Sequence, residues 1–186
     1  MYEIEVKAHL RDRDKVKEKL EALGCVFSPE FHQVDKIFIP EGKPFPEPLG
    51  TPCLRVRQEN NRTLLTLKIT QSGRQDCIER ELEIKDGDRM VEIIKLLRFY
   101  EIPSVDKIRI KTHVKDMEIV LDAVKGLGDF IEAEKIVTEE NPEVRKKIQQ
   151  ELFLFLDALD IKEEDRVLEG KYPTMLFEKF GMKGHE

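Results

Sequence analysis

The feature of this sequence that most constrains its fold is a two-residue alternation that places charge on one face of successive predicted strands. It begins at Tyr2–Ala8, where every second position is charged: Glu3, Glu5 and Lys7. A two-residue period puts alternate side chains on opposite faces of a β-strand. Because the same alternation recurs downstream, the charged faces of several strands need a common environment, and a closed barrel with a polar interior supplies one.

The chain is predicted to form one α+β domain, residues 1–186. Its further strands are predicted at Phe31–Ile39, Leu54–Gln58, Thr63–Thr70, Ile78–Lys85, Ser104–His113, Met117–Val124 and Phe130–Val137. Helices are predicted from Asp12 or Asp14 to about Leu23, from Asp86 or Asp88 to about Tyr100, from Asn141 to about Leu159, and from Pro173 to Phe180. The segment Pro40–Pro52 is rich in Pro and Gly, and it is predicted to be a long loop that covers or flanks a binding site.

The charged residues on the predicted inward faces separate by sign. The bases are Lys7, Arg55, Arg57, Lys68, Lys107, Arg109 and Lys111, and the acids are Glu3, Glu5, Glu79, Glu81, Asp122, Glu132 and Glu134. Guanidinium groups match phosphate oxygens bidentately and lysines add point charges, so the bases predict a small polyanionic ligand. Carboxylates two residues apart on one strand face can share a hard divalent cation, which predicts Mg²⁺ or Mn²⁺ between the acids and the phosphates.

The same alternation also has a plainer interpretation. Strands with one face in water often carry Glu and Lys at alternate positions, where cross-strand pairs are worth roughly a few tenths of a kcal/mol. On this interpretation the charged faces point to solvent, as we expect for Glu83 at a strand end and Glu118 near a turn. The pattern alone leaves both interpretations open.

Composition limits the classes of partner. The net charge of -6, from 32 Lys+Arg and 38 Asp+Glu, argues against a general nucleic-acid surface. No segment approaches the roughly 20 apolar residues of a membrane span, and no secretory leader is recognisable. The three cysteines, Cys25, Cys53 and Cys77, are widely spaced and are predicted to be reduced thiols of a cytoplasmic protein. The GxxxxGK[ST], GxGxxG and HExxH motifs are absent.

Several segments match the motifs of one known family. They are ExExK at Glu3–Lys7, LRxR at Leu54–Arg57, TxK at Thr66–Lys68, ExExE at Glu79–Glu83, a second basic pair at Lys107–Arg109, and LDxVxGLGxFxExE at Leu121–Glu134. With these motifs spread over nearly its whole length, the chain resembles the CYTH domains, or triphosphate tunnel metalloenzymes. This superfamily contains class IV adenylyl cyclases and thiamine triphosphatases, and the resemblance is greatest to the cyclase-like branch.

The resemblance implies a closed eight-stranded antiparallel β-barrel, the triphosphate tunnel, with helices packed outside. It implies that the triphosphate is bound by Arg55, Arg57, Lys68, Lys107 and Arg109. It implies that Mg²⁺ or Mn²⁺ is held by Glu3, Glu5, Glu81, Asp122, Glu132 and Glu134. Lys7, Glu5 and Arg109 are the residues for which it implies a part in catalysis.

Two reactions and one non-catalytic role follow from this resemblance. In the cyclase reaction, the 3′-hydroxyl of ATP attacks the α-phosphorus and pyrophosphate leaves. In the hydrolase reaction, water attacks tripolyphosphate, thiamine triphosphate or a nucleoside triphosphate. A binding module for polyphosphate or nucleotide is the third alternative. The sequence also leaves open whether the helix face of Ile148, Leu152 and Phe155 covers the barrel or meets a second copy in a homodimer.

Overall fold

Eight antiparallel strands form a closed barrel in the computed structural model, which describes residues 2–73, 76–168 and 171–182. The strands are β1 (Tyr2–His9), β2 (Phe31–Pro40), β3 (Pro52–Glu59), β4 (Arg62–Gly73), β5 (Asp76–Ile84), β6 (Phe99–Val114), β7 (Met117–Val124) and β8 (Gly128–Val137). Their order around the barrel is β5-β4-β3-β2-β6-β7-β8-β1, and β1 closes it by pairing with β5 at Tyr2, Glu3 and Ile4. The predicted barrel is therefore confirmed.

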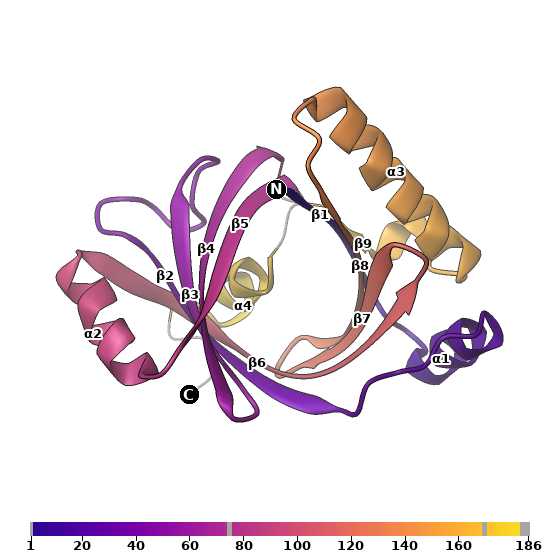
Figure 1. The fold of residues 1–186 in the computed structure, drawn as a ribbon, viewed down its shortest axis with the longest axis horizontal. Coiled ribbons are helices and arrows are strands. Elements are labelled where there is room, and N and C mark those ends of the chain that lie inside the picture. The colour runs from indigo at the N-terminus through magenta and orange to yellow at the C-terminus, as the bar shows by residue number, and fades with distance from the viewer. Residues whose placement is uncertain (1, 74–75, 169–170, 183–186) are drawn as a thin grey trace.

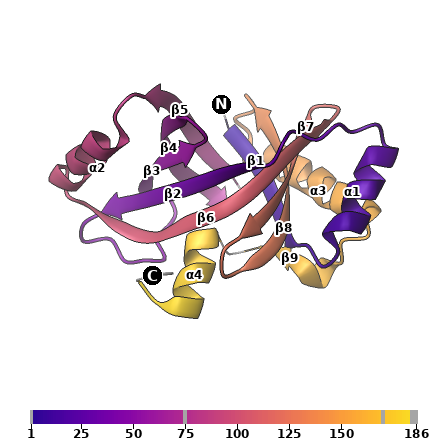
Figure 2. The same cartoon turned by 90° about the horizontal axis from the view of Figure 1, so that it is seen from below.

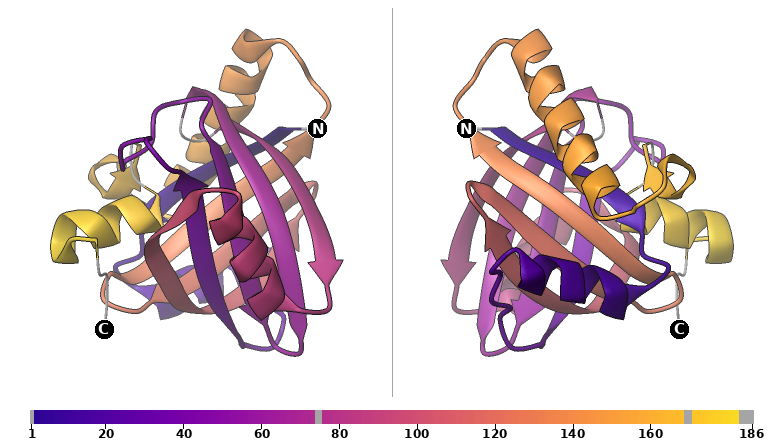
Figure 3. Two further views of the ribbon diagram at one scale, coloured as in Figure 1. Left: turned by 90° about the vertical axis from the view of Figure 1, so that its left-hand side faces the viewer. Right: turned by 90° about the vertical axis from the view of Figure 1, so that its right-hand side faces the viewer.

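Among the residues that the structure describes, four α-helices surround this barrel. They are α1 (Arg13–Ala22), α2 (Gly87–Leu96), α3 (Pro142–Ala158) and α4 (Tyr172–Phe180). Helices α1 and α3 lie on one side, α2 lies on the opposite side, and α4 lies across one end of the ring of strands (Figures 1, 2 and 3). A short strand, β9 (Arg166–Val167), which follows the 3₁₀ turn η1 (Glu163–Asp165), pairs with β1 and has no counterpart in the sequence-based prediction.

The main hydrophobic core lies outside the barrel wall. The apolar face of β1 (Ile4, Val6 and Ala8) packs with β7 and β8 against α1 and α3, whose Leu20 and Leu152 are fully buried. A second cluster sits beneath α2, and a third joins one end of the barrel to α4. Burying the apolar faces under helices leaves the opposite, charged faces directed inward, since successive strand residues point to opposite sides.

The apolar face of α3 packs on the barrel. Leu152 is fully buried in the main core, and Ile148 and Phe155 contact it as partly buried residues. Of the two alternatives for this face, the structure shows that it covers the barrel. Each long helix also has its predicted cap: the Asp12, Asp86 and Asn141 side chains accept hydrogen bonds from the amides of Lys15, Arg89 and Glu143, respectively.

The predicted end of α2 and the predicted start of β6 are wrong. Helix α2 ends at Leu96 and not near Tyr100, because Arg98 adopts a positive φ of 62° and turns the chain into β6. That strand begins at Phe99, five residues before the predicted start, and pairs with the end of β2. Pro103, which lacks an amide hydrogen, lies in this strand where the β2–β6 register shifts. Within the described residues, no helix combines the length and apolar character needed to cross a membrane.

Candidate functional site

The charged inner faces of the strands enclose a cavity of about 460 Å³. Every base on the predicted inward face lines it, as does every predicted acid except Asp122. Burial of charge is costly unless each group is paired, and the pairing here is extensive. The interpretation of these faces as solvated strand surfaces is therefore wrong for most of these side chains. Lys7, Arg57, Lys107, Arg109 and Glu132 are all buried.

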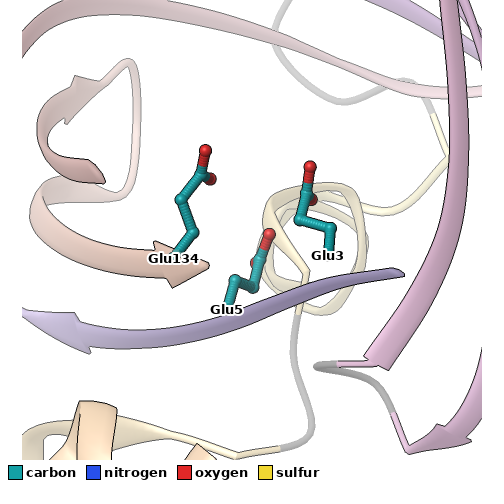
Figure 4. A group of neighbouring side chains, drawn as sticks. All are labelled: Glu3, Glu5 and Glu134. Carbon is teal, nitrogen blue, oxygen red and sulfur yellow. The ribbon is translucent and has the colours of Figure 1, made fainter. Parts of the chain in front are cut away.

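Three glutamates form a group that fits a hard divalent cation. Glu3 and Glu5 extend from β1 and Glu134 from β8, and Figure 4 shows them pointing toward a common space. Their ligand oxygens lie within 4.8 Å of one another. Glu5 and Glu134 are directly opposite across the β1–β8 pair, and Glu118 is opposite Glu134 on β7. Like charges in such positions repel, so this arrangement favours a bound cation.

The electrostatics of Glu134 agree with that fit. Burial, together with the nearby carboxylates of Glu3, Glu118 and Glu5, raises the pKa of Glu134 to about 8. Oxygen-only donors are those that Mg²⁺ and Mn²⁺ prefer. Of the six predicted metal ligands, the structure brings together Glu3, Glu5 and Glu134.

The other three predicted metal ligands lie outside this group and contact bases instead. Asp122 is fully buried behind the lining and accepts hydrogen bonds from Arg109 and Lys107. Glu132 pairs with Lys7 at 3.1 Å and with Arg109 at 2.7 Å. Glu81 accepts a hydrogen bond from Thr66 and lies 3.3 Å from Arg55. For these three acids the geometry supports pairing with bases and not membership of the three-glutamate group.

A basic wall of β3 and β6 residues faces the carboxylates. We define the basic wall as Arg55, Arg57, Lys107 and Arg109. The Nη2 atom of Arg55 contacts Thr66, Glu79 and Glu81, whereas its buried Nε has no hydrogen-bond partner among the described residues. That unpartnered donor suits an additional anionic ligand, since a buried N–H without a partner carries a desolvation cost.

Two lysines of the cavity have pKa values shifted in opposite directions. Burial and the positive charge of Arg109 together lower the pKa of Lys107 to about 8, against the opposing effect of Asp122. For Lys7 burial also lowers the pKa, but Glu132 and Glu5 outweigh it, so the pKa lies above its usual value. The amino group of Lys68 lies between two glutamates, at 2.7 Å from Glu3 and 2.6 Å from Glu79.

Several lining residues were absent from the sequence-based set of site residues. Lys171 and Tyr172 reach the cavity from the start of α4, and the Tyr172 hydroxyl donates a hydrogen bond to Asp122 at 3.1 Å. The Lys7 amino group lies 4.0 Å from the centre of the Tyr172 ring. Asp35 lines the cavity from β2. Glu118, which we expected at the surface, lines it beside Lys111 at 2.7 Å.

The loop and the cysteines agree with the sequence-based expectations. Phe45 and Glu47 of the Pro-rich loop line the cavity, so this loop flanks it as predicted. The three cysteines, all of them among the described residues, form no disulfide bond with one another. Burial raises the pKa of Cys53 to about 11 and also raises that of Cys77, so both cavity cysteines carry neutral thiols near pH 7.

A closed antiparallel barrel with a charged interior defines this chain as a tunnel-type barrel protein. The chain belongs to the CYTH domain family, whose model matches residues 1–170. It is 33% identical over 174 residues to a Methanocaldococcus jannaschii protein named "Putative adenylate cyclase MJ0240", a match that covers 92% of this chain and 97% of the relative. Residues 171–182, which include Lys171 and Tyr172 of the lining, follow the family match.

Two solved structures illustrate the range of similar folds. The PH1012 protein from Pyrococcus horikoshii is 31% identical and superposes with a TM-score of 0.75, covering 94% of this chain and 98% of that one. A more distant structure is HpAC1 from Hippeastrum, at 17% identity and a TM-score of 0.56, covering 98% of this chain and 100% of that one. HpAC1 is described as having a dominant triphosphatase activity, and its likeness to this chain establishes the fold alone.

Proposed function

We propose that this protein is a metal-dependent enzyme that breaks a phosphoanhydride bond of a triphosphate held in the tunnel. The observation that carries the proposal is the enclosure of the three-glutamate group and the basic wall in one cavity. A pure anion-binding module needs the bases but has no use for converging glutamates. This asymmetry favours an enzyme over a binding module.

Each part of the lining has a defined role in this proposal. Glu3, Glu5 and Glu134 hold Mg²⁺ or Mn²⁺, which when bound supplies Lewis-acid stabilisation of charge on phosphate oxygens. The basic wall and Lys68 bind the phosphate chain, and Arg109 with Lys7 stabilises charge that develops on the reacting and leaving oxygens. Arg109 is preorganised, because Asp122 and Glu132 accept its hydrogen bonds before any substrate binds.

We favour cyclisation of ATP, in which the 3′-hydroxyl attacks the α-phosphorus and pyrophosphate leaves. Support comes from the 33%-identical relative, which is named "Putative adenylate cyclase MJ0240". Hydrolysis of a triphosphate is the second candidate, and the composition of the lining favours it. Among the described lining residues there is no Asn or Gln, the side chains that often read a nucleobase by paired hydrogen bonds.

The reaction is identified by its products. The protein is incubated with ATP, tripolyphosphate or thiamine triphosphate, each with Mg²⁺ or Mn²⁺, and with EDTA as the control. Cyclic AMP and pyrophosphate from ATP support cyclisation, whereas orthophosphate release supports hydrolysis. Binding of all three compounds with no product would refute the enzyme proposal and leave the binding module.

Binding of the divalent cation is expected to release a proton near neutral pH. In the metal-free protein Glu134 is largely protonated below its pKa of about 8, and only its ionised form can coordinate the cation. Affinity for Mn²⁺ should therefore rise with pH up to about 8 and then level off. Calorimetric titration in buffers of different ionisation enthalpy measures the proton released.

Two variants test whether Glu134 causes this pH dependence of Mn²⁺ binding. Glu134→Gln should bind Mn²⁺ more weakly than the unaltered protein. Its affinity should also no longer rise over the range of about one to two pH units below the pKa of Glu134. Glu83→Gln is the matched control, because Glu83 is an exposed glutamate paired with Arg62 outside the cavity lining. An unchanged pH profile in Glu134→Gln would show that another group carries the proton.

Arg57→Ala is expected to weaken binding of tripolyphosphate by about 2 kcal/mol, the value of a charge-assisted hydrogen-bonded contact, or roughly thirtyfold. Arg57 is a buried member of the basic wall and lines the cavity. Titration calorimetry measures the dissociation constant. Arg62→Ala, on the same β3–β4 hairpin but exposed, should leave it unchanged. Equal affinities for Arg57→Ala and the unaltered protein would exclude Arg57 from the phosphate site.

A further inference from the structure

An acid from β2 is placed among the bases of the basic wall. Asp35 lines the cavity and is 3% exposed. Burial raises the pKa of Asp35, but Arg57 outweighs this effect, with help from Arg55 and Lys107, so the pKa lies below its usual value. By charge alone, a carboxylate at this place should weaken the binding of a polyanion, so its presence needs a different explanation.

The contact between Asp35 and Arg57 is bidentate. Arg57 donates from Nε to Oδ1 at 2.6 Å and from Nη2 to Oδ2 at 2.8 Å. These two residues stand directly opposite each other in the β2–β3 pair. A guanidinium has five N–H donors, so a carboxylate that binds the Nε–Nη2 edge leaves the Nη1 donors available to another acceptor. The carboxylate therefore fixes the plane of the guanidinium as well as its position.

The same arrangement occurs in the second half of the barrel. Arg109 of β6 and Asp122 of β7 are also directly opposite, and Arg109 donates from Nε and Nη2 to the two Asp122 oxygens. Two arginines of the basic wall are thus held by the same edge, each by an aspartate of the adjacent strand. Because the contact occurs in two strand pairs, we infer that these aspartates orient the arginines of the basic wall.

The backbone beside Asp35 is irregular. The β2–β6 register shifts between Asp35, which pairs with Val105, and Ile37, which pairs with Ile102, so β6 contains one extra residue there. Such a bulge changes the direction of neighbouring side chains, and bulges are over-represented beside functional sites. The bulge therefore lies next to the acid that grips Arg57.

We propose that Asp35 is a positioning residue for triphosphate recognition, which holds the Arg57 guanidinium by its Nε–Nη2 edge so that the Nη1 end faces the phosphate chain. This inference rests on the proposed function, because it assumes that the ligand of the tunnel is a triphosphate. Loss of this orientation costs more affinity than is gained by removing one negative charge from the cavity.

The test compares tripolyphosphate binding to three full-length proteins in EDTA, by titration calorimetry: the unaltered protein, Asp35→Asn and Asp76→Asn. Asp76 is the matched control, since Arg145 grips it in the same bidentate way at 3.0 and 2.9 Å, outside the cavity lining. Both variants remove a carboxylate from a buried Arg–Asp pair. Asp35→Asn should bind about tenfold more weakly, and Asp76→Asn within about twofold of the unaltered protein.

A second comparison shows whether Asp35 acts through Arg57. In the Arg57→Ala background, adding Asp35→Asn should cause no further loss of affinity, because the group that Asp35 orients is gone. Asp35→Glu keeps the charge and displaces the carboxylate by one methylene, so it too should bind more weakly. It also serves if Asp35→Asn does not fold, which thermal unfolding reveals.

The outcomes separate the two proposals. Binding by Asp35→Asn as tight as, or tighter than, that of the unaltered protein would overturn the positioning role and show that Asp35 acts only as a repulsive charge. A loss as large in Asp76→Asn, or a full further loss in the Arg57→Ala background, would overturn it as a general effect on structure. If the unaltered protein does not bind tripolyphosphate, the proposed function fails and the inference falls with it.

Discussion

Glu5→Gln is expected to lower turnover by roughly a thousandfold, which corresponds to the several kcal/mol that a catalytic metal contributes. Glu5 belongs to the three-glutamate group and stands directly opposite Glu134. Replacing its carboxylate by an amide removes a charged ligand while preserving the shape of the side chain. Steady-state rates with the substrate identified by the product assay, measured over a range of Mn²⁺ concentrations, test this expectation.

The loss should be specific to metal-dependent turnover. Affinity for tripolyphosphate in EDTA should change little, because the substituted amide leaves the basic wall intact. Lys7 lies 3.3 Å from Glu5 but keeps its 3.1 Å pair with Glu132. Glu83→Gln should behave as the unaltered protein does. A Glu5→Gln rate close to normal at saturating Mn²⁺ would count decisively against the metal site.

Arg109→Ala is expected to abolish detectable turnover and to lower the free energy of unfolding by roughly 3–5 kcal/mol at pH 7, the cost of leaving a buried charge unpaired. Arg109 connects Asp122 and Glu132, which are buried. Without its guanidinium, both carboxylates face low-dielectric surroundings with fewer partners. Urea unfolding at equilibrium measures the stability.

The pH dependence of that loss has a definite sign. Burial raises the pKa of Asp122, but Lys107 and Arg109 outweigh burial and the pKa lies below its usual value. Burial likewise raises the pKa of Glu132, but Lys7 and Arg109 outweigh it and this pKa is also lowered. A carboxyl group with a lowered pKa stabilises the folded state at pH values above its ordinary pKa, which is 3.8 for Asp122 and 4.5 for Glu132. This contribution is lost as the pH falls through the lowered pKa. The stability difference between Arg109→Ala and the unaltered protein should therefore be largest at pH 7 and shrink below about pH 4.

Two other substitutions define what Arg109 contributes. Arg109→Lys keeps a positive charge but cannot grip Asp122 by two parallel hydrogen bonds, so it should recover part of the stability and little of the turnover. Arg62→Ala removes an exposed pair with Glu83 and should change stability by less than about 1 kcal/mol. A stability of Arg109→Ala within that same margin would mean that the buried pairs contribute little.

Much of this fold could be predicted because strand spacing is a local property. In β1, Ile4 and Val6 had to share a face that excludes water, which directs Glu3, Glu5 and Lys7 to the other side. The boundary between α2 and β6, in contrast, is not determined by the local sequence pattern. Phe99 and Tyr100 continue the helical apolar pattern but are drawn into pairing with β2, since tertiary contacts override helix propensity.

Many of the charged side chains that line the cavity could be predicted from strand spacing, but their partners could not. The ion pair of Lys68 and Glu3 joins residues 65 positions apart, and it depends on the closure of β1 against β5. The resemblance to CYTH domains implied a metal ligand at Asp122, yet the register of β6 and β7 places this residue opposite Arg109. Tyr172 reaches the tunnel only because α4 docks across one end of the barrel, which no pattern within that helix indicates.

We propose that a divalent cation and a triphosphate share the tunnel, with the cation among the glutamates and the phosphates on the basic wall. A crystal structure with Mn²⁺ and tripolyphosphate, with anomalous scattering used to locate the manganese, tests it most directly. We predict a manganese peak bounded by Glu3, Glu5 and Glu134, and phosphate oxygens in contact with Arg55 and Arg57. Manganese and phosphate bound on the outer surface of the barrel, with the tunnel holding neither, would refute this proposal.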